Sequence, residues 1–166
     1  GGANVTVLRS FRENDEPSIA GVQINPINPN TTSDLTCTPL GWNDNDGDSA
    51  NYHFTWYRNS IEMFTFSSAT TSTLLSGNTT KYETWNCTAL PDDSYENGTS
   101  RSSTTYINNS KPQVALVSED GDPIKGGNIQ NITIGGIADN DNDSLTITCC
   151  LDESNMCYPT IGNNIC

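Results

Sequence analysis

The sequence of 166 residues lacks features that several classes of protein need. No apolar run approaches 18 residues, so we expect no membrane-spanning helix. Lysine and arginine total 7 against 20 acidic residues, giving a net charge of −13, whereas nucleic-acid binding requires a basic surface. A single histidine leaves little material for histidine-based catalysis or zinc binding. Only 33% of the residues are hydrophobic, which argues against one large core.

The sequence contains no motif typical of an enzyme. We find no Ser/His/Asp spacing, no glycine-rich phosphate loop and no nucleophile motif. Paired carboxylates occur only in two aspartate-rich segments, where turn or metal-binding roles explain them better than acid–base catalysis. We therefore expect a protein without enzymatic activity.

Six cysteines, an even number, predict disulfide bonds. Their spacing does not match a pair of zinc knuckles. Disulfide bonds persist outside the cytoplasm, so the cysteines predict an extracellular protein. The cysteines are Cys37, Cys87, Cys149, Cys150, Cys157 and Cys166.

Eight N-x-S/T sequons agree with an extracellular location and predict N-linked glycans. Roughly five would arise by chance from the asparagine, serine and threonine content, so the excess is modest. The sequons begin at Asn4, Asn30, Asn78, Asn86, Asn97, Asn108, Asn131 and Asn142.

Two segments recur 95 residues further along the chain. Residues 16–22 resemble residues 111–117, and residues 43–49 resemble residues 138–144. Two matches at one offset indicate a repeat of about 95 residues. The predicted domains are an N-terminal strand and linker over 1–15, a first unit over 16–110 and a truncated, disulfide-rich second unit over 111–166.

The local pattern within each unit is that of short β-strands. Apolar residues alternate with polar ones in residues 52–57 and 82–90, the period of a half-buried strand. Short strands about ten residues apart, between clusters of Asn, Asp, Gly, Pro and Ser, predict an all-β sandwich. The expected strands cover 19–24, 35–38, 52–57, 82–90, 104–107, 114–117, 129–134 and 145–149.

The order Cys37, Trp56, Cys87 resembles the immunoglobulin-like sandwich, in which a disulfide bond between two sheets packs against a tryptophan. The resemblance implies tandem immunoglobulin-like domains and a Cys37–Cys87 disulfide bond. Trp85 departs from the family, which often has a tyrosine at the position two residues before the second cysteine.

The acidic segment 44–48, Asp-Asn-Asp-Gly-Asp, and the following strand 54–59, Phe-Thr-Trp-Tyr-Arg-Asn, form a second resemblance. Together they are similar to PKD-like and cadherin-like repeats of archaeal and bacterial surface proteins. The similarity covers residues 16–110 and, more weakly, 111–150. It implies a structural or adhesive spacer of a large cell-surface protein.

The two aspartate-rich loops are the candidate metal sites. Alternate carboxylates in a tight loop point to one side, and Ca²⁺ is bound by such carboxylates and by backbone carbonyls. An EF-hand is excluded, because the twelfth loop position is Thr55 or Cys150 instead of glutamate. The alternative is a solvated polar turn. The candidate ligands are Asp44, Asp46, Asp48, Asp139, Asp141 and Asp143.

Compared with the repeat, the sequence has an extra expected strand at its start and an incomplete unit at its end. Val5, Val7 and Leu8 form an expected strand before the first unit, and the second unit covers about 56 residues of the 95-residue period. Either the chain is a window of a longer tandem array, or its N-terminal strand completes the second domain of a neighbouring copy. The latter mechanism builds a head-to-tail filament.

These features predict a structural subunit of an extracellular filament, pilus-like fibre or surface stalk, with further copies of itself or neighbouring repeats as partners. The alternative is an adhesin or carbohydrate-binding spacer module that uses exposed aromatic residues. Trp42 and Tyr95 are the candidates for stacking on a sugar.

Overall fold

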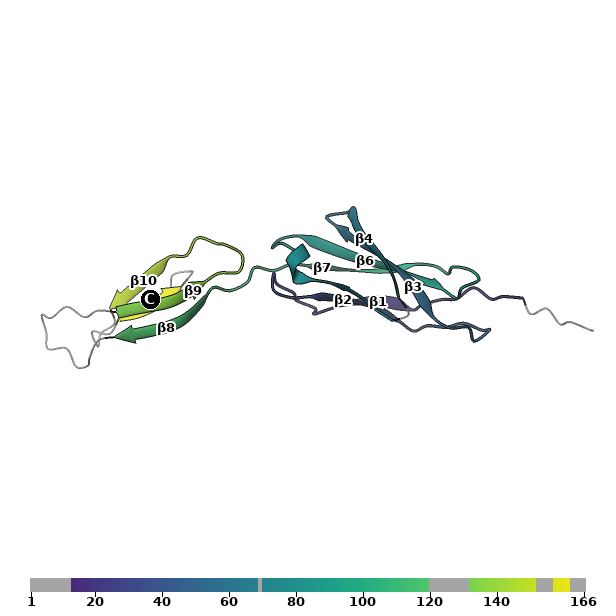
Figure 1. Cartoon of the computed structure of the whole chain (residues 1–166), viewed down its shortest axis with the longest axis horizontal. Coiled ribbons are helices and arrows are strands. Elements are labelled where there is room, and N and C mark those ends of the chain that lie inside the picture. Colours follow the sequence, from purple (N-terminus) through teal and green to yellow (C-terminus); the bar gives the residue numbers. More distant parts are fainter. Residues whose placement is uncertain (1–12, 69, 120–131, 152–156, 162–166) are drawn as a thin grey trace, which may run out of the picture. The chain divides into compact units, whose positions relative to one another are not determined.

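The computed structural model describes residues 13–68, 70–119, 132–151 and 157–161, and its regular structure is almost entirely β (Figure 1). The predicted all-β class is confirmed. None of the helical structure in these residues is long and apolar enough to cross a membrane. The chain divides into two compact units. The first comprises Gly1–Ile27, Leu35–Leu74 and Thr84–Thr105, and the second comprises Asn28–Asp34, Leu75–Glu83 and Tyr106–Cys166.

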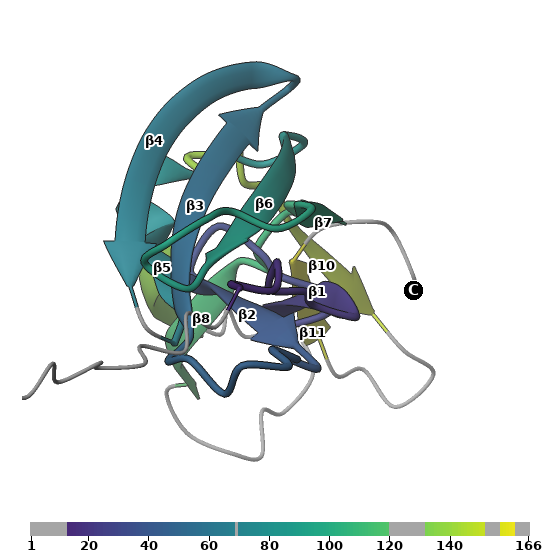
Figure 2. The ribbon, with the colours of Figure 1, turned by 90° about the vertical axis from the view of Figure 1, so that its right-hand side faces the viewer.

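The first unit is organised around two antiparallel sheets (Figure 2). One has the order β1-β2-β5, with strands β1 (Gly21–Asn25), β2 (Leu35–Leu40) and β5 (Ser72–Leu74). The other has the order β4-β3-β6-β7, with strands β4 (Ile61–Ser68), β3 (Asn51–Arg58), β6 (Thr84–Asp92) and β7 (Arg101–Tyr106). This division of strands is that expected of an immunoglobulin-like sandwich.

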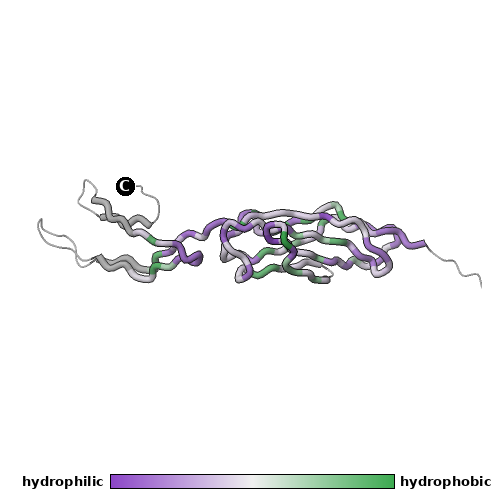
Figure 3. Tube along the Cα trace, turned by 90° about the horizontal axis from the view of Figure 1, so that it is seen from above, coloured by the Kyte–Doolittle hydropathy of each residue, from purple (hydrophilic) through white to green (hydrophobic). Residues whose placement is uncertain are grey.

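The core lies between the two sheets. The apolar residues that alternate with polar ones in the sequence point into it. Burial alternates along β3 and along β6. Hydrophobic and hydrophilic residues are interspersed along the described part of the chain (Figure 3). Trp56 of β3 and Trp85 of β6 are fully buried, with ring centroids 6.5 Å apart in an edge-to-face arrangement. The buried Trp56 indole donates a hydrogen bond of 3.0 Å to the Ser72 hydroxyl of the opposite sheet.

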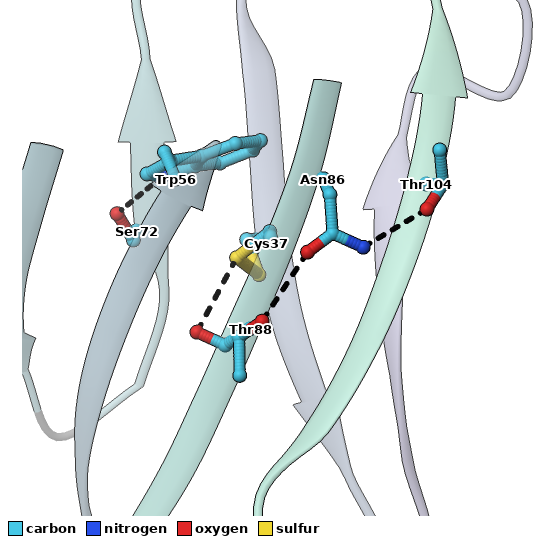
Figure 4. The surroundings of a disulfide bond; sticks show 7 residues. Cys37, Trp56, Ser72, Asn86, Thr88 and Thr104 are labelled. Carbon is cyan, nitrogen blue, oxygen red and sulfur yellow. Dashed lines mark hydrogen bonds between the residues drawn. A yellow bond between two sulfur atoms is a disulfide. The ribbon is translucent and has the colours of Figure 1, made fainter. Parts of the chain in front are cut away.

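The Cys37–Cys87 disulfide bond joins β2 to β6 across this core (Figure 4). The pairing that the family resemblance implied is therefore confirmed. Both cysteines are fully buried, and they close a loop with a sequence separation of 50. Closing a loop of this length stabilises the fold by roughly 4 kcal/mol in the chain-entropy account.

Strand β4 was not predicted, and its position explains why. It follows a hairpin turn in which Asn59 (φ 47°) and Ser60 (φ 70°) both have positive φ, as a type I′ turn requires. As the edge strand of its sheet, β4 has no fully buried residue, so its sequence does not alternate like that of β3. The sequence analysis was wrong to expect no strand over residues 61–68, because the alternation criterion detects half-buried strands only.

The second unit contains two antiparallel strand pairs. Strand β8 (Gln113–Glu119) pairs with β9 (Ile132–Ala138), and β10 (Ile147–Leu151) pairs with β11 (Cys157–Ile161). The 3-10 turn η1 (Ser76–Asn78) also belongs to this unit. The side chains of Cys149, Cys150 and Cys157 and the whole of Cys166 lie outside the described residues, so their predicted pairing stays a prediction.

The 95-residue repeat extends to details of the backbone. Gly41 has φ +66°, and a Cβ atom added there would lie 2.7 Å from the Ala20 Cβ. Gly136 has φ +64°, and a Cβ atom there would lie 2.5 Å from the Ala115 Cβ. The two glycines and the two alanines are each separated by 95 positions, so the same close approach recurs.

The core predicts the effect of removing the disulfide bond. Replacing Cys37 and Cys87 together by alanine should lower the free energy of unfolding by about 2–5 kcal/mol, because the unfolded chain regains its loop entropy. Urea denaturation followed by tryptophan fluorescence measures this loss. A variant as stable as the parent chain under non-reducing conditions would contradict the assigned role of the bond.

Candidate functional site

The first acidic loop is organised by the carboxylate of Asp44. Its Oδ1 accepts hydrogen bonds from the backbone N–H groups of Gly47 (2.7 Å) and Asp48 (3.1 Å). Gly47 has φ +79°, which a residue with a side chain rarely adopts. The loop therefore turns around one carboxylate oxygen and leaves the other oxygen of Asp44 for a different partner.

Three carboxylates of the first unit gather beside this loop: Asp44, Asp48 and Asp93. Each offers an oxygen, and these oxygens lie within 4.8 Å of one another. Asp93 follows β6 and is only 2% exposed. The sequence analysis did not predict it as a ligand. The predicted ligand Asp46 instead accepts a hydrogen bond of 2.6 Å from the backbone N–H of Asp15 through its Oδ2. The structure thus brings together two of the three predicted ligands and adds one.

The Asp93 carboxylate is held by three donors. Its Oδ1 accepts from the backbone N–H groups of Tyr95 and Glu96, each at 2.7 Å. Its Oδ2 accepts from the side-chain amide of Asn14 at 2.8 Å. Burial alone would raise the pKa of Asp93, but the hydrogen bonds together outweigh burial and hold the pKa below its ordinary value. Asp93 is therefore an ionised carboxylate at neutral pH.

The second acidic loop repeats one of the two hydrogen bonds that close the first, the bond from the backbone N–H four residues after the first aspartate. Asp139 Oδ1 accepts hydrogen bonds from the backbone N–H groups of Asp141 (2.8 Å) and Asp143 (3.2 Å). Asn142, at φ +56°, stands where the first loop has Gly47. All three predicted ligands, Asp139, Asp141 and Asp143, offer oxygens within 4.8 Å of one another.

Other segments of the second unit contact this loop. Asp141 Oδ2 accepts a hydrogen bond of 2.5 Å from the backbone N–H of Ser110, and Asp141 Oδ1 accepts one from the Thr31 hydroxyl. The Lys81 ammonium forms an ion pair with Asp143. The hydrogen bond from Lys81 lowers the pKa of Asp143, and the same bond raises the pKa of Lys81.

Each loop contains one buried carboxylate oxygen that has no hydrogen-bond partner. These are Asp44 Oδ2 and Asp139 Oδ2, which occupy equivalent positions of the repeat. A buried charged oxygen without a donor is costly, so a partner is expected there. Clustered carboxylate oxygens of this kind fit a Ca²⁺ ion, which binds six to eight oxygen ligands.

A Ser–His–Asp chain of hydrogen bonds crosses the β4-β3-β6 sheet. Ser67 Oγ lies 2.8 Å from His53 Nδ1, and His53 Nε2 lies 2.9 Å from Asp92 Oδ2. No spacing in the sequence predicts these hydrogen bonds, because strand pairing brings the three residues together. The His53 side chain is 44% exposed on an open sheet face, whereas a serine nucleophile works beside a preorganised oxyanion site. We interpret the chain as a polar cross-strand ladder.

Six of the eight sequon asparagines lie within the described residues, whereas Asn4 and Asn131 do not. The exposed ones are Asn78, Asn97, Asn108 and Asn142, and the partly buried ones are Asn30 and Asn86. In the middle of the β3-β6-β7 sheet, the Asn86 amide donates to the Thr104 hydroxyl at 2.9 Å (Figure 4). The exposed sequons are therefore the more accessible attachment points.

The two predicted sugar-stacking residues have different surroundings. Trp42 packs edge-to-face on Tyr52 with ring centroids 5.6 Å apart, whereas Tyr95 is 76% exposed. Exposed Tyr82 and Tyr106, the last residue of β7, lie with their ring centroids 6.4 Å apart, a pair that the sequence analysis did not identify. The predicted donor residues Val5, Val7 and Leu8 lie outside the described residues.

Comparison of the chain with protein-family models, curated proteins and solved structures finds no match.

The hydrogen bonds to Asp93 predict an effect on acid stability. Because the pKa of Asp93 is lower in the folded protein than in the unfolded chain, its contribution is present above the ordinary value of 3.8 and is lost as the pH falls below it. The variant Asp93→Asn should therefore show a shallower fall in Tm between about pH 4 and pH 2. Differential scanning calorimetry measures this slope.

Glu62→Gln is the matched control, since Glu62 is an exposed residue of β4. It should retain the slope of the parent chain. A slope that Asp93→Asn leaves unchanged would show that Asp93 does not contribute to acid stability.

Proposed function

We propose that this protein is a non-enzymatic structural module of an extracellular filament, pilus-like fibre or surface stalk. The observation that carries the proposal is a hydrogen bond that occurs in both units. Asp46 binds the backbone N–H of Asp15 in the first unit, and Asp141 binds that of Ser110 in the second. Both donors and both acceptors are 95 positions apart. We call each of these bonds a linker clamp.

The linker clamp fixes the chain immediately before a sandwich begins. An asparagine precedes each clamped residue: Asn14 donates to Asp93, and Asn109 hydrogen bonds to Asp143. A proline follows two positions after each clamped residue, at Pro17 and Pro112, and it restricts the backbone further. Modules whose incoming segment is held in the same way suit a stalk or fibre, where successive units need a defined spacing.

Strand pairing in the second unit supports assembly by strand donation. In the first unit β3 pairs with both β4 and β6, but in the second unit β10 pairs only with β11 among the described strands. The other edge of β10 can therefore accept a further strand. We propose that residues 5–8 of a neighbouring copy supply this strand and that repeated donation gives a head-to-tail polymer.

Two features support the extracellular location in this proposal. The buried Cys37–Cys87 disulfide bond requires an oxidising compartment to persist. Sequons such as Asn78 and Asn97 lie at exposed positions, where N-linked glycans are sterically tolerated. The resemblance of residues 44–48 and 54–59 to PKD-like and cadherin-like surface repeats agrees with the same location.

The exposed tyrosines support a second candidate function, that of an adhesin or carbohydrate-binding spacer. Tyr82 and Tyr106 lie side by side, and the Lys81 ammonium lies 5.7 Å from the Tyr82 ring centroid. Adjacent exposed aromatic rings can stack on the apolar faces of sugars. Binding to a glycan array that is lost in Tyr82→Ala would favour this candidate over a purely structural module.

The linker clamps predict slow exchange of two particular amides. In Asp46→Ala and in Asp141→Ala, the amides of Asp15 and Ser110 respectively should exchange at least tenfold faster, since each loses its acceptor. Hydrogen–deuterium exchange resolved by fragmentation mass spectrometry measures this. The exposed residues Ser49 and Ser144, also 95 positions apart, provide control variants to alanine that should leave both rates unchanged. Unaltered exchange in the aspartate variants would remove the basis of the structural proposal.

Strand donation predicts polymers that depend on one face of the N-terminal strand. Alternate residues of a strand face the same side, so the double variant Val5→Asp/Val7→Asp should prevent assembly, while Thr6→Asp should not. Light scattering and negative-stain microscopy of the full chain provide the measurement. A parent chain that remains monomeric at all concentrations, or a Thr6 variant as defective as the valine variant, would contradict strand donation.

A further inference from the structure

A pocket on the outer face of the larger sheet of the first unit contains a sequon asparagine. Its volume is about 370 Å³, which is within the range of small-molecule sites. All of its lining side chains are uncharged, and each is half-buried or exposed. The pocket, here called the Asn86 pocket, therefore suits a neutral ligand rich in hydroxyl groups. It is lined by Tyr57, Ser60, Thr84, Asn86 and Thr104.

Tyr57 provides an aromatic surface beside Asn86. The two residues lie directly opposite each other on β3 and β6. Side chains at opposite positions of neighbouring strands are close enough to contact each other or a shared ligand. A tyrosine ring presents an apolar body and a polar tip, a combination that matches the apolar face and the hydroxyl groups of a sugar.

Two hydrogen bonds fix the orientation of the Asn86 amide (Figure 4). Its Nδ2 donates to Thr104 Oγ1 at 2.9 Å, and its Oδ1 accepts from the hydroxyl of Thr88, the third residue of the sequon, at 3.2 Å. A side-chain amide carries two N–H donors, and the bond to Thr104 uses one of them. An N-linked glycan replaces one amide hydrogen, so both hydrogen bonds can remain in the glycosylated residue. Half-burial does not exclude a sugar here, because the pocket provides space beside the amide.

We propose that Asn86 carries an N-linked glycan whose first sugar lies in the Asn86 pocket and stacks on the ring of Tyr57. An activated glycosyl phosphate supplies the sugar: the bond from Nδ2 to the anomeric carbon forms, the bond from that carbon to the phosphate oxygen breaks, and Nδ2 releases one proton. The inference goes beyond the structural role and rests on the extracellular location proposed above. The sugar contacts β3, β6 and β7 together, so it stabilises their sheet.

Glycopeptide mass spectrometry of the full chain, secreted from a host that attaches N-glycans, tests the modification. Asn86 should be glycosylated in the parent chain and in Thr88→Ser, which keeps the sequon, but not in Thr88→Ala. Asn97 provides the matched control, since it is exposed and lies outside the pocket. Removing its glycan by Thr99→Ala should leave the Tm unchanged, whereas removing the Asn86 glycan should lower it by about 4 °C.

Thermal denaturation of a double-mutant cycle tests the contact between ring and sugar. Tyr57→Ala should lower the Tm by about 4 °C more in the glycosylated chain than in Asn86→Gln, because both changes remove the same contact. Tyr57→Phe retains the ring and should behave like the parent chain.

The proposal is overturned if Asn86 is unmodified while Asn97 is glycosylated, or if the changes at Tyr57 and Asn86 lower the Tm additively. Binding of an added monosaccharide to an unmodified Asn86 pocket would also overturn it and would assign the pocket to an external sugar. Absence of a glycan from every sequon would count against the extracellular location as well, so the two failures can be distinguished. None of these results affects the linker clamps, which are tested by amide exchange.

Discussion

The Cys37–Cys87 disulfide bond is the constraint on which the first unit depends. A chain that is 33% hydrophobic buries little apolar surface, and its core consists mainly of a few large side chains around the bond. The disulfide fixes β2 to β6, and Trp56 and Trp85 fill the space between the sheets. Within the larger sheet, β6 pairs with β3 in a register that places Asp92 opposite Asn51, and this pairing brings Asp93 to the acidic loop that precedes β3.

The aspartates of the acidic loops are alike in sequence but have different structural roles. The first aspartate, Asp44 or Asp139, closes the loop around its own Oδ1. The middle aspartate, Asp46 or Asp141, holds the incoming linker. In each cluster of three aspartates, one oxygen of every carboxylate lies within 4.8 Å of the others, so the carboxylates repel one another. The net charge of −13 is therefore in part a structural feature.

Sequence patterns predicted the features that have a local signature. Alternation predicts β3 and β6, and the offset of 95 predicts the second acidic loop. Strand β4 was missed because an edge strand lacks a buried face. Asp93 was missed because its approach to Asp44 depends on strand order. The hydrogen bonds that link Ser67, His53 and Asp92 were missed for the same reason, since no spacing along the sequence encodes a neighbour across a sheet.

The two units also show which parts of a repeat are preserved and which vary. The close approaches of Gly41 and Gly136, one hydrogen bond that closes each acidic loop and the linker clamps all arise from residues inside one period, and they recur after 95 positions. Asp93 and Lys81 come to the loops from outside them, and neither loop has both. A repeat can therefore keep its backbone while neighbouring segments set the charge at each loop.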